Sequence, residues 1–88
     1  MSLEILEKQA TILKALSHPR RLEIIHLIRD KELPVQDIHQ MLDLPQANVS
    51  QHLTLLRESN IVKNRKDGKH HYYSLTDPKI IQANDLIK

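Results

Sequence analysis

The sequence contains no cysteine, and glycine occurs only once, at Gly68. Without thiols the chain can form no disulfide, and it has no thiol for catalysis or redox sensing. It also lacks an apolar run long enough to cross a membrane, and its N-terminus has no signal-peptide pattern. A cytoplasmic protein is therefore expected.

The residue patterns of common active sites are missing as well. The sequence has no glycine-rich phosphate loop, no paired carboxylates at a plausible site and no nucleophile beside a general base. An enzyme is therefore the weakest interpretation. With 88 residues, a single domain over residues 1–88 is expected.

Positive charge is modest overall but locally concentrated. The net charge is +2 and the isoelectric point is near 9.0. Residues 63–71 contain four Lys or Arg, one Asp and two His. Such a patch favours phosphate binding, although a merely soluble basic hairpin has the same composition.

Residues 44–57 predict a helix with two different faces. At 100° per residue, Val49, His52, Leu53 and Leu56 gather on one side. The opposite side carries short or amide side chains, namely Gln46, Ala47, Ser50, Gln51 and Thr54. A surface helix usually carries Glu and Lys pairs, whereas uncharged amides and hydroxyls suit base edges in a DNA groove. A recognition helix is the favoured interpretation, and a surface helix of a small bundle is the plain alternative.

The remaining elements form a recognisable order. Hydrophobic periodicity and helix-capping residues predict helices at 3–16, 19–30, 35–42, 46–58 and 78–87. Asp43 and Asn60 are suited to the left-handed conformation that ends a helix. The tight turn between the third and fourth helices predicts a helix-turn-helix unit. The connection at 31–34 can include a short extended segment.

Asp67-Gly68 separates two strand-like runs, which predicts a β-hairpin with these two residues in its turn. Side chains alternate between the faces of a strand. Those expected against the helices are Val62, Tyr73 and Leu75, and those expected to point away are Arg65, His70 and Tyr72. The predicted fold is mainly α with a small β-hairpin wing (α+β), a winged helix-turn-helix.

Several segments, at matching distances from one another, also resemble a known family. They are Ser17-His18-Pro19-Arg20-Arg21-Leu22, Val49-Ser50-Gln51-His52-Leu53-Thr54-Leu55-Leu56, Ile61-Val62, and Arg65-Lys66-Asp67-Gly68-Lys69 with Tyr73. Over nearly its whole length the chain resembles the ArsR/SmtB family of dimeric bacterial and archaeal transcriptional repressors. The resemblance implies operator binding by the recognition helix and wing, dimerisation through the first and last helices, and release of DNA by an effector.

The metal sites of that family do not transfer to this sequence. Many metal-sensing members have two cysteines in the stretch that matches residues 32–38, and here those positions are Pro34 and Gln36. Other members use Asp and His on the last helix, but residues 77–88 contain no histidine. The six histidines of the chain have no chelating spacing. No metal or other cofactor is expected, and the effector is unknown.

These features predict a sequence-specific DNA-binding regulator, most simply a repressor that binds a palindromic operator as a homodimer. The predicted DNA contacts are Gln46, Asn48, Ser50, Gln51, Thr54, Lys63, Arg65, Lys66, Lys69 and His70. The predicted dimer interface uses 3–16 and 78–87, with Leu3, Leu6, Ala10, Leu13, Ile80, Ile81 and Ile87. His52, at the flank of the apolar face, is expected to tie its helix to the domain by a hydrogen bond rather than to touch a base. The alternative function is a winged-helix module for protein–protein contact, which would have an apolar outward face on 46–58.

Overall fold

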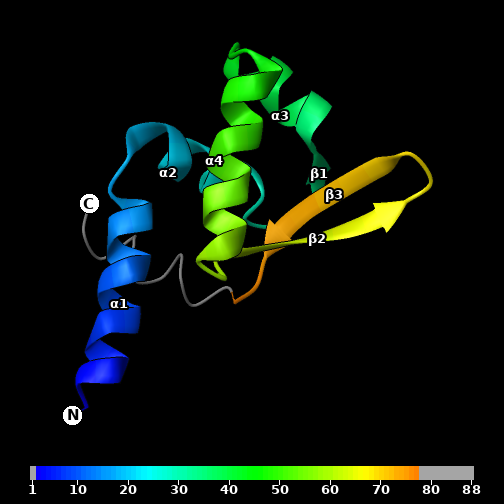
Figure 1. Ribbon diagram of the computed structural model, residues 1–88. Coiled ribbons are helices and arrows are strands. Elements are labelled where there is room, and N and C mark those ends of the chain that lie inside the picture. Colours follow the sequence, from blue (N-terminus) through cyan, green and yellow to red (C-terminus); the bar gives the residue numbers. More distant parts are fainter. Residues whose placement is uncertain (1, 78–88) are drawn as a thin grey trace.

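Four helices and a three-stranded antiparallel sheet form the part of the chain that the structure, a computed structural model, describes: residues 2–77 (Figure 1). In chain order they are α1 (Leu3–Leu16), α2 (Pro19–Leu27), β1 (Leu33–Pro34), α3 (Val35–Leu42), α4 (Gln46–Glu58), β2 (Val62–Asp67) and β3 (His70–Leu75). The predicted helix at 78–87 lies outside the described residues. No helix within residues 2–77 combines the length and apolar character needed to cross a membrane.

Local chemistry explains where the helices begin and end. Ser2 caps α1 by accepting a hydrogen bond from the Ile5 N–H at 3.2 Å. Asp43 and Asn60 have φ values of 54° and 60°, which confirms the predicted left-handed stops. The prediction that α2 reaches residue 30 was wrong, because Ile28 already leaves the helical conformation and the chain then turns toward the sheet.

The sheet has the order β1-β3-β2, so the hairpin is joined by a third, two-residue strand. Leu33 pairs with Tyr73, and this pairing fixes the base of the hairpin beside α3. Val62 lies opposite Leu75 and Asp67 opposite His70, which puts Gly68 and Lys69 in the turn. The hairpin itself is confirmed, but its turn lies one residue later than predicted. Gly68 has φ +63°, a conformation that a β-carbon would strain.

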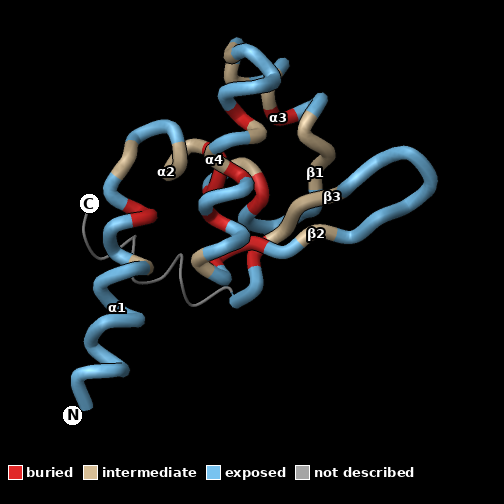
Figure 2. The backbone as a smooth tube through the Cα atoms, in the orientation of Figure 1, coloured by how far each residue is buried: buried red, intermediate tan, exposed pale blue. Residues whose placement is uncertain are grey.

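One hydrophobic core joins α4 to α2, α3 and the sheet (Figure 2). Its fully buried side chains are Ile24, Ile25, Ile28, Ile38, Val49, Leu53, Leu56, Ile61 and Val62, with Leu75 nearly so. The predicted apolar face of α4 is thus confirmed at Val49, Leu53 and Leu56. Because α4 is held by this face, its opposite face is left to solvent.

Helix α1 extends away from the other described elements and is almost wholly exposed (Figures 1 and 2). Only Ala15 and Leu16, at its C-terminal end, are buried. Leu3, Leu6 and Leu13 expose 70%, 44% and 57% of their surface. An isolated protein rarely leaves such a stripe of leucines in water.

Candidate nucleic-acid interface

The outward face of α4 is polar and uncharged over its first three turns. Gln46, Asn48, Gln51 and Thr54 are exposed, and Ser50 is half-buried. The Thr54 hydroxyl donates to the Ser50 carbonyl at 2.9 Å, so this side chain is folded back on its own helix. The exposed amides of Gln46, Asn48 and Gln51 can present hydrogen-bond donors and acceptors outward, as base recognition requires.

Two hydrogen bonds tie Leu44, in the turn between α3 and α4, to His39 of α3. The Leu44 N–H donates to the His39 carbonyl at 3.0 Å, and His39 Nδ1 lies 3.1 Å from the Leu44 carbonyl oxygen. The imidazole N–H can donate to that oxygen. His39 therefore fixes the angle between the two helices, a role that the sequence spacing had not indicated.

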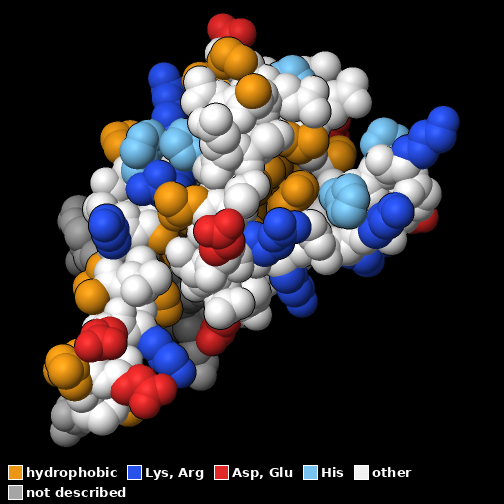
Figure 3. Space-filling view, viewed as in Figure 1, with side chains coloured by type: hydrophobic (Ala, Val, Ile, Leu, Met, Phe, Trp, Pro, Cys, Tyr) orange, Lys and Arg blue, Asp and Glu red, His pale blue; other side chains and the backbone are white. Residues whose placement is uncertain are grey.

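The wing, defined as the hairpin of β2 and β3, carries the basic side chains away from the core (Figure 3). Lys63, Lys66, Lys69 and His70 are exposed. None of these residues belongs to the buried core. Their charges can therefore approach an external polyanion without disturbing the packing.

Arg65 differs from the other cations of the wing because its guanidinium is already engaged. Its Nη2 and Nε lie 2.7 and 3.1 Å from Glu32 Oε1, across the sheet, and Nη1 lies 3.6 Å from Asp67 Oδ2. The guanidinium also lies 4.9 Å from the centre of the Tyr72 ring. The hydrogen bond from Arg65 lowers the pKa of Glu32, and the same bond raises the pKa of Arg65. Arg65 thus braces the wing against the segment before β1.

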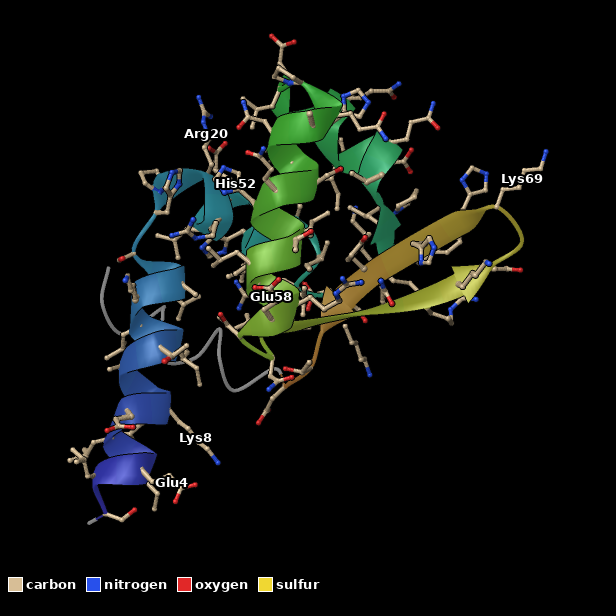
Figure 4. The ribbon with its side chains drawn as sticks, in the orientation of Figure 1. Glu4, Lys8, Arg20, His52, Glu58 and Lys69 are labelled. Carbon is tan, nitrogen blue, oxygen red and sulfur yellow. The ribbon has the colours of Figure 1, made fainter. Side chains whose placement is uncertain are left out.

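The His52 side chain points from α4 toward α2 (Figure 4). It does not lie on the outward, solvent-facing side of α4. Its ring centre lies 4.7 Å from that of His18, whose Nδ1 caps α2 by accepting from the Arg20 N–H at 3.1 Å. Burial is the main reason why the pKa of His52 is lowered. The electrostatic effects of His18 and Arg21 lower the pKa further. The contact to the domain is thus a ring contact with His18, where a hydrogen bond was predicted.

The predicted dimer residues on α1, Leu3, Leu6, Ala10 and Leu13, are all exposed. The other predicted interface residues, Ile80, Ile81 and Ile87, lie outside the described part of the chain. Within residues 2–77, no three His, Asp or Glu side chains converge in a way that could hold a metal ion.

The order helix, helix, helix-turn-helix and basic wing is matched by a known family. The sequence profile described as bacterial regulatory protein, arsR family, matches residues 18–64, just over half of the chain. The chain belongs to the ArsR family. The matched segment runs from the His18 cap through α4 into β2 and so contains both helices of the helix-turn-helix.

Curated relatives and solved structures agree with this assignment. The ArsR-family chain is 43% identical over 76 residues to the transcriptional repressor PagR of Bacillus anthracis, covering 85% of this chain and 76% of PagR. It is 34% identical to the transcriptional activator HlyU of Vibrio cholerae, covering 99% of this chain and 84% of HlyU. A homodimeric winged helix-turn-helix DNA-binding domain from Mycobacterium bovis, solved by NMR, superposes with a TM-score of 0.87 at 26% identity, covering 96% and 78% of the two chains.

These findings make this ArsR-family protein a transcription regulator rather than an enzyme. They also confirm the predicted winged helix-turn-helix fold. The individual residues expected to touch DNA remain predictions, whose positions on α4 and the wing are now defined.

Proposed function

We propose that this regulator is a cytoplasmic repressor that binds a palindromic operator as a homodimer. In this proposal α4 enters the major groove, where Gln46, Asn48, Ser50, Gln51 and Thr54 meet base edges or nearby phosphates. Lys63, Lys66, Lys69 and His70 of the wing hold the sugar–phosphate backbone.

The observation that carries the proposal is the division of α4 into two faces. Val49, Leu53 and Leu56 are at most 1% exposed, whereas Gln46 and Gln51 are exposed and no charged side chain precedes Arg57 on the helix. A helix that is anchored on one side and lined with uncharged amides on the other fits direct readout of bases. A protein–protein module would need an apolar outward face, and the outward face of α4 is polar.

The exposed leucines of α1 are the observation that supports the proposed homodimer. Leu3, Leu6 and Leu13 form an exposed stripe on this helix, and a second copy related by a two-fold axis would cover it. Residues 78–87, which continue the apolar pattern in the sequence, are proposed to complete the interface. We propose that residues 1–88 form one DNA-binding domain, with these two helices as its dimerisation part.

The role of Arg65 is narrower than the sequence alone indicated. It is one of the predicted DNA contacts, but its guanidinium is held by Glu32 and Asp67 in the free protein. We propose that Arg65 positions the wing first and touches DNA only where a phosphate or base edge replaces Glu32.

The test is a mobility shift on the DNA upstream of the protein's own gene, run in parallel with a scrambled fragment at several salt concentrations. We expect a shifted complex with two protomers per site and affinity for the upstream DNA at least about 10³-fold above that for the scrambled DNA. Equal affinity for both fragments at every salt concentration would refute sequence-specific regulation. Transcription in vitro from the same promoter then decides between repression and activation.

A further inference from the structure

A hollow of about 210 Å³ lies between the wing and the first turns of α3 and α4. Its polar lining comes from α3, α4 and the hairpin: Gln36, Gln46, Lys69, His70, His71 and Tyr73. Several water molecules, each occupying about 30 Å³ in the liquid, would fit in this volume. A tetrahedral oxyanion such as phosphate, which is no larger than a few water molecules, would fit as well.

The chemistry of the lining suits a negative charge. None of the described residues that line the hollow is acidic, and the basic groups are one lysine and two imidazoles. The two glutamines add amide donors. A site with one fixed cation, titratable imidazoles and neutral amides is suited to binding a phosphate group.

Successive residues of β3 point to opposite faces, and this separates the two histidines of the wing. His70 shares a face with Tyr72, and their ring centres are 6.4 Å apart. His71 shares its face with Tyr73, which packs against the core on the side of the helices. His71 therefore lines the hollow from the same strand face as Tyr73.

The position of the hollow in the proposed interface indicates that a phosphate of the DNA backbone would bind there. In the proposed complex α4 occupies the major groove and the wing contacts the backbone beside it. The hollow lies between these two elements, so the DNA group proposed to come nearest to it is a phosphate of the backbone that borders the major groove.

We propose that this hollow binds one phosphate of the DNA backbone, and that His71 is its pH-dependent ligand. The proposal rests on the proposed function and adds a regulated contact to the same interface. Near pH 8 an imidazole is neutral and has a single N–H donor, whereas near pH 6 it gains a charge and a second donor. DNA affinity should therefore rise as the pH falls.

Charged side chains lie on several of the elements around His71. On the wing, Lys66 is the cross-strand partner of His71, Lys69 lies in the turn, and Asp67 lies opposite His70. On the helices, Asp37 lies in the first turn of α3, and α4 has no acidic residue in its first turn. A bound phosphate, being an anion, would favour the protonated imidazole, so protonation and DNA binding are linked in this proposal.

The experiment measures operator affinity at pH 8.0 and pH 6.0 by fluorescence anisotropy for the wild type, His71→Gln and the control His26→Gln. His26 lies on α2, away from the hollow. For the wild type and the control we expect binding about fivefold or more tighter at pH 6.0, in line with one gained charge-assisted hydrogen bond. His71→Gln should show a smaller gain than the wild type, with the rest supplied by His70, and its salt slope at pH 6.0 should be lower by about one unit.

The outcomes separate this inference from the proposed function. An operator complex that forms with the same pH dependence in the wild type and His71→Gln overturns the phosphate contact and leaves DNA binding in place. Absence of a specific complex at both pH values overturns both. If NMR titration shows that inorganic phosphate binds the wild type at His71 with sub-millimolar affinity while DNA binding is unchanged by His71→Gln, the hollow serves a free anion and not DNA.

Discussion

Gln51 is the residue on which sequence choice should depend most directly. It is exposed in the middle of α4 and lies opposite the buried Leu53 and Val49. A glutamine side chain can pair with adenine through two hydrogen bonds, so Gln51→Ala should cost roughly 1–3 kcal/mol on the operator. Binding to random DNA and the free energy of unfolding should barely change. Titrations of both DNAs by fluorescence anisotropy measure this difference.

Gln40→Ala is the matched control, because Gln40 is an exposed glutamine of α3 outside the proposed interface. It should leave both affinities unchanged. If Gln51→Ala weakens operator and random DNA by the same factor, Gln51 contacts a phosphate and not a base.

His52 should make the stability of the fold depend on pH. Burial beside His18 lowers its pKa in the folded state, so below about pH 6.5 the unfolded chain binds a proton that the folded chain resists. The free energy of unfolding should therefore fall as the pH drops through this range, until the folded-state pKa is passed. Urea unfolding between pH 8 and pH 5 measures the effect.

His52→Gln removes this titration and should flatten the pH dependence of stability while lowering stability itself. NMR titration of the His52 ring gives an independent check. A midpoint at or above the value for an unfolded histidine would contradict the assignment.

At the scale of the elements, the wing should supply affinity without sequence choice. Lys66 and Lys69 lie exposed at its tip. Replacing both by Ala should weaken operator and random DNA alike and lower the salt slope of binding by about two units, because each lysine is expected to neutralise one phosphate. Lys8→Ala with Lys14→Ala, which removes two lysines from α1, should leave the slope unchanged. An unaltered slope in the wing variant would mean that the tip does not touch DNA.

Helices were predictable from the sequence because each depends on a repeat of apolar residues within about fifteen positions. The bounds of α1 and α3, the buried face of α4 and the left-handed stops at Asp43 and Asn60 all followed from such local signals. The strand β1 has only two residues, Leu33 and Pro34, and cannot show a period. Its pairing with β3 depends on residues about forty positions away. The turn was misplaced by one residue because Asp-Gly favours a turn without fixing its register.

The contacts that shape the candidate site were hidden for the same reason. Arg65 and Glu32 are 33 positions apart, and neither residue type indicates the other as its partner. The contact between His18 and His52 also joins two distant segments. Periodicity assigns a residue to a face of its own helix or strand, but only the packing of elements decides what lies against that face.

At the scale of the whole molecule, specific operator binding should require the homodimer. Leu6→Glu puts a charge into the exposed leucine stripe of α1 and should convert the dimer into a monomer. Specific operator binding should disappear with it, since a palindrome is read by two α4 helices about one helical turn apart. Weak binding to random DNA should survive, because α4 and the wing are untouched. Sedimentation and anisotropy at equal concentrations test both effects.

Thr11→Glu is the matched control, because it adds the same charge on the polar side of α1, where the Thr11 hydroxyl donates to the Glu7 carbonyl at 3.0 Å. This variant should remain dimeric and bind normally. A wild type that sediments as a monomer at tens of micromolar would refute the dimer.

The exposed leucines of α1 also have a consequence for how the regulator responds to its own abundance. If the surface is covered only when two copies meet, the amount of active species at low expression rises with the square of the chain concentration. Operator occupancy then changes more steeply than the amount of protein, and halving the dose removes more than half of the control. Dilution alone can thus switch the regulated gene, with no small molecule needed.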